Sequence, residues 1–125
     1  MRENTPPTVL LVDDEASILH ALRRLLHHLG YQVLCARSGL EALHISAQGG
    51  IDLVLSDIQM PGMSGHEVAA ALRDQCPVLL MTGNFSQYSA GVLAKPFSGS
   101  ELKARISEHL PQYHCMRAAT AGIAE

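Results

Sequence analysis

The sequence predicts an α/β fold in which helices cover both faces of a five-stranded parallel sheet. Short apolar runs without polar–apolar alternation are typical of strands buried on both faces. Stretches with helical spacing of apolar residues separate these runs, and alternation of strand and helix indicates parallel pairing. Four of the runs, at residues 8–12, 53–56, 78–81 and 92–94, lead into Asp13 and Asp14, Asp57, Thr82 and Lys95.

Five strands follow from the apolar runs and the turn-forming residues around them. They are expected at Thr8–Val12, Tyr31–Ala36, Leu53–Ser56, Pro77–Met81 and Gly91–Ala94. In an open parallel sheet, the carboxyl ends of the strands meet at one edge, where such folds place their sites. The polar groups at the strand ends are therefore expected to meet in space, although they are scattered along the chain.

The first two helices are predicted between the first three strands. Residues 16–29 carry an apolar stripe at helical spacing, made by Ile18, Leu22, Leu25, Leu26 and Leu29. Gly30 follows directly, as is common after the last helical residue. A weaker pattern predicts a second helix near Gly39–Ala47, which ends before Gly49 and Gly50.

Two more helices have recognisable starts. Ser64 is a suitable N-cap for a helix that reaches about Arg73. Ser98 and Glu101 have the spacing of a capping box and open the last helix. Its buried face is expected to contain Leu102, Ile106 and Leu110, and Pro111 is expected to end it.

Length and composition indicate one globular domain. The 125 residues suffice for one domain and are too few for two, and the 47% hydrophobic content supports a real core. We expect a lead-in at 1–7, the domain at 8–110 and a tail or linker at 111–125. The net charge of −3, without a basic block, argues against direct nucleic-acid binding.

The location is expected to be cytoplasmic. No apolar stretch approaches the ~20 residues of a bilayer span, and the first residues lack the apolar segment of a secretory signal. Cys35, Cys76 and Cys115 are odd in number and contain no C-x-x-C pair. They are interpreted as reduced thiols, two of them filling the core. The sequence contains seven histidines, and His20, His27, His28, His109 and His114 are interpreted as surface residues and not as a metal site.

The carboxylates at the strand ends predict a cation site. Asp13, Asp14 and Asp57 would repel each other at one sheet edge, and a bound cation would relieve that repulsion. Oxygen ligands suit Mg²⁺ or Mn²⁺. A carboxylate beside such an ion can attack phosphorus and form an aspartyl phosphate, while Lys95 and Thr82 offer an ammonium and a hydroxyl to the phosphoryl oxygens. Each residue alone would be read as a turn, cap or solvated residue; the joint pattern is what is specific.

At this point the chain resembles the receiver domains of bacterial two-component response regulators. The resemblance covers about residues 8–110. Its motifs are Val9-Leu10-Leu11-Val12-Asp13-Asp14-Glu15, Asp57-Ile58-Gln59-Met60-Pro61-Gly62-Met63-Ser64-Gly65, Met81-Thr82 and Lys95-Pro96-Phe97. It implies a flavodoxin-like sheet of order 2-1-3-4-5.

The resemblance also implies a role for each site residue. Asp57 would accept a phosphoryl group from a histidine kinase or phosphotransfer protein. Asp14, Asp57 and the backbone carbonyl of Gln59 would hold Mg²⁺, with Asp13 assisting. Lys95 would pair with the phosphoryl group, and Thr82 would turn toward it. By the same resemblance, Lys95-Pro96 matches the position of a cis peptide, which proline makes accessible.

The sequence departs from the family pattern in two places. The family usually has Tyr or Phe three residues before the lysine, whereas this chain has Val92, which puts the usual coupling between that ring and the threonine in question. In addition, only Gly83–Ala90 are left to connect the last two strands. A parallel crossover with its helix normally takes at least ~10–12 residues. The helix between strands four and five, fourth in the family's order, is therefore predicted to be missing or reduced to about one turn.

The leading hypothesis is a phosphorylatable signalling receiver that is not itself an enzyme beyond self-phosphotransfer and autodephosphorylation. One alternative is a constitutive interaction or dimerisation module with a little-used phosphorylation site. It would act through the face formed by strands four and five and the last helix, where a missing helix would expose apolar surface. A metal-dependent phosphohydrolase is a weaker alternative, since nothing resembles an extra acid–base carboxylate or a cap domain.

Overall fold

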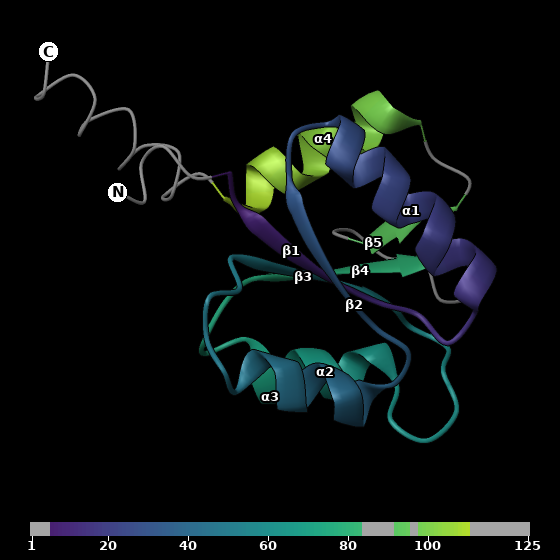
Figure 1. The fold of residues 1–125 in the computed structure, drawn as a ribbon. Coiled ribbons are helices and arrows are strands. Elements are labelled where there is room, and N and C mark those ends of the chain that lie inside the picture. Colours follow the sequence, from purple (N-terminus) through teal and green to yellow (C-terminus); the bar gives the residue numbers. More distant parts are fainter. Residues whose placement is uncertain (1–5, 84–91, 96–97, 111–125) are drawn as a thin grey trace, which may run out of the picture.

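All five predicted strands join one parallel sheet in the computed structural model, which describes residues 6–83, 92–95 and 98–110 (Figure 1). The strand order is β2-β1-β3-β4-β5, as predicted. The strands are β1 Thr8–Val12, β2 Gln32–Ala36, β3 Leu53–Asp57, β4 Val78–Thr82 and β5 Val92–Ala94. The helices within these residues are α1 Ala16–His28, α2 Gly39–Ser46, α3 Gly65–Leu72 and α4 Gly99–His109.

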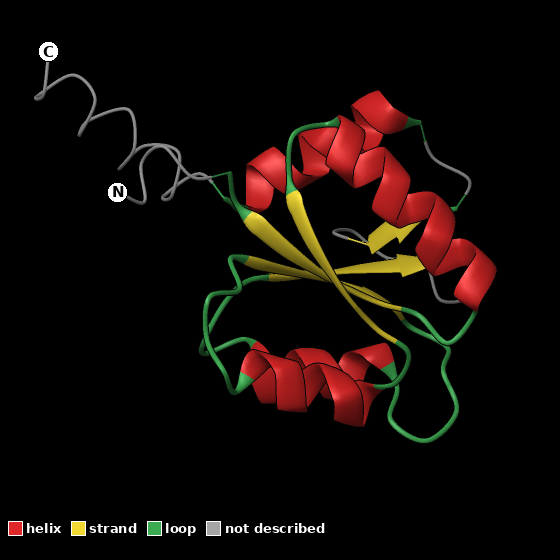
Figure 2. Cartoon of the chain, viewed as in Figure 1, coloured by secondary structure: helices red, strands yellow, loops and turns green. Residues whose placement is uncertain are grey.

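The helices form one layer on each face of the sheet. Figure 2 shows α1 and α4 on one side and α2 and α3 on the other. Between the sheet and the first layer lies an apolar cluster that includes Leu11, Leu26 and Ile106, and between the sheet and the second lies one that includes Leu10 and Val68. Burial on both faces explains why β1 and β3 are continuous apolar runs in the sequence.

The helix boundaries agree with the local chemistry of the sequence. Ser64 and Ser98 each cap a helix through a complete capping box, in which the glutamate three residues later returns the bond to the cap backbone. Gly30 follows α1 with φ +100°, a conformation that favours glycine. The buried residues of α1 include Leu19, which the predicted stripe omitted.

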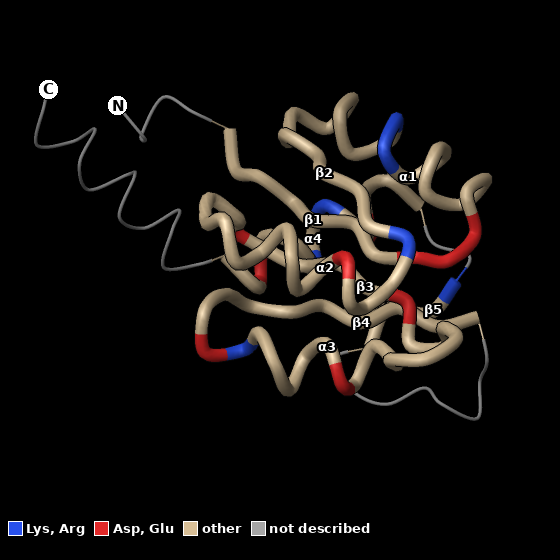
Figure 3. Tube along the Cα trace, turned by 60° about the horizontal axis from the view of Figure 1, so that its bottom comes forward, with Lys and Arg blue, Asp and Glu red and all other residues tan. Residues whose placement is uncertain are grey.

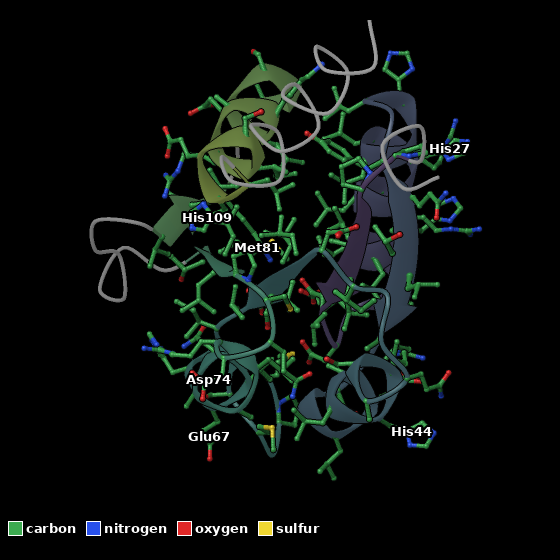
Figure 4. All side chains as sticks on the ribbon, turned by 90° about the vertical axis from the view of Figure 1, so that its left-hand side faces the viewer. His27, His44, Glu67, Asp74, Met81 and His109 are labelled. Carbon is green, nitrogen blue, oxygen red and sulfur yellow. The ribbon has the colours of Figure 1, made fainter. Side chains whose placement is uncertain are left out.

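The register of the sheet brings the predicted site residues to one edge. Val12 at the end of β1 pairs with Ser56 of β3, and Asp57 pairs with Met81 of β4. The next residues along β1 and β4 are Asp13 and Thr82. Met81 lies in the centre of the molecule, surrounded by other side chains (Figure 4), so the sheet edge is anchored in the core.

Several expectations fall on residues that the structure does not describe. One is the prediction that the helix between β4 and β5 is missing or very short, because residues 84–91 are not described. The helix labelled α4 is the predicted last helix, which begins at Gly99. The cis peptide before Pro96, the tail after residue 110 and Cys115 also lie outside the described residues, so these remain predictions. Of the other cysteines, Cys76 is buried and Cys35 half-buried. Within the described ranges, no helix is both long and apolar enough to cross a membrane.

Candidate functional site

Three carboxylates gather at the carboxyl edge of the sheet. One carboxylate oxygen each from Asp13, Asp14 and Asp57 lies within 4.8 Å of the others. Asp13 is fully buried and Asp57 is 9% exposed. Figure 3 shows the acidic turn after β1 near the acidic end of β3. The structure thus brings together the acidic residues that the sequence singled out, from strands 44 positions apart.

Lys95 enters this cluster from the end of β5 and bridges two of its members. Its Nζ lies 3.3 Å from Asp13 Oδ2 and 3.2 Å from Asp57 Oδ1. Its backbone N–H donates to the carbonyl of Thr82 at 2.7 Å, which ties β5 to the buried end of β4. One ammonium offsets only one of the three negative charges, so the ionised cluster retains the charge of about two electrons that a divalent cation would balance.

Burial and neighbouring charges shift the ionisation of both partners. Burial raises the pKa of the Asp57 carboxyl, Lys95 opposes this shift, and the carboxylates of Asp13 and Asp14 add to it. Burial alone would lower the pKa of Lys95, but the carboxylates of Asp13 and Asp57 outweigh it, and the pKa is raised. Lys95 therefore stays protonated at neutral pH, and its positive charge is available to an anion at Asp57.

The turn after β1 is held from several directions. Asp13 Oδ1 accepts the backbone N–H of Glu15 at 3.0 Å, and the Asp13 backbone N–H donates to Ala36 at 3.1 Å. The Arg37 guanidinium donates to the carbonyl of Asp14 at 3.3 Å. These contacts hold the carboxylate of Asp13 and the backbone of both aspartates. Arg37 was missed in the sequence because it follows the edge strand β2, where no motif marks it.

The backbone of Asp57 is equally constrained. The hydroxyl of Ser56 donates to the Asp57 carbonyl at 2.9 Å, and the N–H of Ile58 donates to Met81 at 3.1 Å. Gly65, the first residue of α3, packs so closely that an added Cβ would meet the Asp57 carbonyl oxygen and lie 2.9 Å from the Cα of Ile58. Gly65 belongs to the motif that begins at Asp57. Only the tertiary contact reveals that its missing side chain lets α3 approach the backbone of Asp57 and Ile58.

The two remaining predicted residues lie at the same edge. Thr82 ends β4 and is 2% exposed. Gln59 lies two residues after Asp57 and lines a cavity of about 570 Å³ with Ile58, Met60, Pro61, Ser64 and His66. The labelled histidines His27, His44 and His109 lie far apart (Figure 4). Among the described residues, the carboxylate triad is the one group of potential metal ligands. His20, His27 and His28 are exposed, as predicted, whereas His109 is half-buried.

A family model and curated relatives both match most of the chain. The model of the response regulator receiver domain matches residues 9–107. The uncharacterized transcriptional regulatory protein YkoG of Bacillus subtilis is 39% identical over 116 residues, covering 83% of this chain and 51% of that protein. The response regulator MprA of Mycobacterium sp. (strain KMS) is 38% identical over 113 residues, covering 81% and 49%. The chain thus spans about half the length of these relatives.

Solved structures of receiver proteins share the fold. The response regulator TrrA of Thermotoga maritima, solved in complex with Mg²⁺–BeF, is 33% identical with a TM-score of 0.75, over 83% of this chain and 99% of that one. A response regulator receiver domain of Clostridium thermocellum is 27% identical with a TM-score of 0.76, over 88% and 98%. Fold, site geometry and sequence similarity therefore agree.

Proposed function

This chain belongs to the family of response regulator receiver domains, and from that premise we propose that it is a phosphorylation-activated switch whose phosphoacceptor is Asp57. The phosphoryl donor is a histidine kinase or phosphotransfer protein of a two-component system. The observation that carries the proposal is the position of Asp57, a poorly solvated carboxylate 3.2 Å from the ammonium of Lys95 and within one cluster with Asp13 and Asp14. The receiver unit is taken as residues 8–110.

The donor set fits a hard divalent cation. Three carboxylates converge with one lysine between them, and carboxylate oxygens are what Mg²⁺ prefers. Asp13, Asp14, Asp57 and the backbone carbonyl of Gln59 would hold the ion, as we propose from the family pattern. A bound Mg²⁺ would supply positive charge to the phosphoryl oxygens during transfer. The proposal favours Mg²⁺ over Mn²⁺, because the TrrA complex contains Mg²⁺.

The transfer step uses the side chains of this chain in distinct roles. A carboxylate oxygen of Asp57 forms a bond to phosphorus, while the bond from phosphorus to the donor's nitrogen breaks and its electron pair leaves with the donor. Lys95 offsets the charge on the phosphoryl oxygens. Ser56, Ile58 and Gly65 hold the backbone of Asp57 in place. Thr82 is the hydroxyl donor of the phosphorylated state.

Intact-mass spectrometry after incubation with acetyl phosphate tests this function. We expect one Mg²⁺-dependent phosphoryl adduct on the wild-type chain, no adduct on Asp57→Asn, and an unchanged adduct on Asp74→Asn. Asp74 is a suitable control because it is an exposed acid outside the site.

Absence of an adduct on a folded wild-type chain would contradict the proposal. It would favour the constitutive interaction module instead. An adduct that survives in Asp57→Asn would assign the phosphoacceptor to another residue.

A further inference from the structure

The outer edge of β2 is the side of this strand that faces away from β1. Among the described residues, β2 is the terminal strand of the sheet and pairs only with β1 (Figure 1). The N–H of Gln32 donates to Pro7, and the carbonyl of Ala36 accepts from Asp13, so both residues direct their backbone groups toward β1. Because these directions alternate along a strand, Val33 and Cys35 direct their N–H and C=O groups outward.

The residues of β2 itself are not of the kinds that usually protect a terminal strand. Natural edges are commonly blocked by charged residues, proline or bulges, whereas β2 consists of Gln-Val-Leu-Cys-Ala in regular register with β1. Leu34 of β2 is 45% exposed, and Leu40, at the start of α2, is 71% exposed. These two are the exposed large hydrophobic residues of the described part of the chain. The edge therefore offers both backbone hydrogen bonds and apolar contact.

The side of the edge that faces α1 is positively charged. A groove of about 680 Å³ runs between α1 and β2 and is lined by Pro6, Arg23, Arg24, His27, Gly30, Tyr31, Gln32 and Val33. In the part of the chain that the structure describes, no carboxylate lines this groove, and neither Arg23 nor Arg24 forms an ion pair. Figure 3 shows this basic segment of α1. Figure 4 shows His27 near nitrogen-tipped side chains at the outside of the molecule.

The two faces of the edge therefore differ in what they would accept. Cys35 pairs with Leu11, which belongs to the core under α1 and α4, whereas Leu34 pairs with Leu10, which belongs to the core over α2 and α3. Successive side chains of an added strand point to opposite faces. Acidic residues would lie toward the arginines of α1, and the apolar residues between them would lie toward Leu34.

We propose that the outer edge of β2 receives an extended segment of a partner protein, with alternating acidic and apolar residues, as a sixth strand of the sheet. The backbone groups of Val33 and Cys35 supply the hydrogen bonds, and Arg23 and Arg24 supply the charge complementarity. A second copy of this chain is disfavoured as the occupant. Two β2 strands paired antiparallel across a two-fold axis normal to the sheet would bring the same arginines toward each other.

Amide hydrogen exchange and chemical shifts of the full ¹⁵N-labelled chain test this surface. The probe is a nine-residue peptide, capped at both ends, in which glutamate alternates with valine. The samples contain neither Mg²⁺ nor a phosphodonor, so the outcome does not depend on phosphorylation at Asp57. We expect the peptide at millimolar concentration to shift the amides of Val33 and Cys35 and to slow their exchange.

Matched probes and variants separate the contributions. A peptide with lysine in place of glutamate and a peptide with alternate backbone nitrogens methylated should each bind at least about tenfold more weakly. The variant Arg23→Glu/Arg24→Glu should lose the glutamate peptide and gain the lysine peptide, while Lys103→Glu on α4 should change neither. Val33→Pro removes one outward N–H without touching the β1 ladder, and should weaken binding in the same way if it folds.

Three results would overturn the proposal. One is unchanged exchange at Val33 and Cys35 at millimolar peptide. Another is a response to inorganic pyrophosphate at α1 without a response of the edge amides to peptide, which would make the groove a small-anion pocket. The third is concentration-dependent self-association in sedimentation that Arg23→Glu/Arg24→Glu alters, which would assign the edge to a second copy.

Discussion

Asp57 combines two properties that oppose each other in an ordinary core residue. The proposed function needs this carboxyl ionised as a nucleophile, yet burial and two neighbouring carboxylates raise its pKa above the usual value of 3.8. Lys95 limits this cost by placing its ammonium 3.2 Å away. The ionised site therefore lowers the stability of the folded chain until another cation binds. Such shifted pKa values are common among residues of functional sites.

The variant Asp57→Asn should be more stable than the wild type at pH 7 in the presence of EDTA. Because the carboxyl pKa is raised by folding, the unfolded chain loses its proton first as the pH rises above about 3.8, and stability falls until the folded carboxyl has also ionised. The amide carries no such cost. We expect Tm to rise by about 2–5 °C, which corresponds to a gain of somewhat less than about 1 kcal/mol in the free energy of unfolding.

The pH dependence of that difference provides the check. In thermal melts the gain of Asp57→Asn should shrink as the pH falls through the carboxyl titration and vanish once the wild-type carboxyl is protonated in both states. Asp74→Asn should show no comparable gain. A wild type more stable than Asp57→Asn at pH 7 would mean that the pairing with Lys95 outweighs the cost of burial.

At the scale of elements, the start of α3 determines where Asp57 lies. The capping box of Ser64 and Glu67 sets the first turn of the helix. The N–H of Gly65 then donates to the carbonyl of Ile58 at 2.9 Å, which draws the helix start onto the end of β3. Only a residue without Cβ fits this approach, so helix α3 and residue Asp57 are positioned as one unit.

Gly65→Ala should lower the free energy of unfolding by about 1–3 kcal/mol, despite the higher helix propensity of alanine. The added methyl group would contact backbone atoms, which cannot rotate away as a side chain would. Urea unfolding measures the loss, and the rate of acetyl phosphate labelling should fall with it. Gly83→Ala is the matched control, since an added Cβ there meets nothing within 4 Å. Equal stability of the two variants would show that the loop before α3 adjusts freely.

At the scale of the whole molecule, the parallel sheet brings the residues of the site together. β1, β3, β4 and β5 each deliver one or two functional groups to the same edge. The cores on both faces hold those strands in register. Charge balance at this edge therefore affects the stability of the domain as a whole, and not only that of one loop.

Lys95→Met should be destabilised by about 1–3 kcal/mol without a divalent cation, because three carboxylates then share an edge with no counter-charge. MgCl₂ should raise Tm of both proteins beyond the effect of KCl at equal ionic strength, and should raise that of Lys95→Met more. Thermal melts with a Lys103→Met control test this. An equal response of Lys95→Met and wild type to MgCl₂ would mean that Lys95 does not compensate the cluster.

Local patterns in the sequence were sufficient for the elements and for most of the site. The apolar runs predicted β1 and β3 because both faces of those strands are buried, and Ser98 with Glu101 predicted the start of α4 because capping is a local interaction. Strand and helix ends differ from the predictions by about one residue, as expected where the last turn or pair is weak.

The sequence by itself determined the fold class and the identity of Asp13, Asp14, Asp57, Thr82 and Lys95 as candidates, since apolar spacing and the motif residues are local properties of the chain. The strand order was implied only by the resemblance to receiver domains. The tertiary structure alone decided the bridge from Lys95 to both Asp13 and Asp57, the approach of Gly65 to the Asp57 carbonyl and the open edge of β2 beside two arginines. Those features depend on distances between residues far apart in the chain, and such distances arise only when the two cores set the register of the sheet.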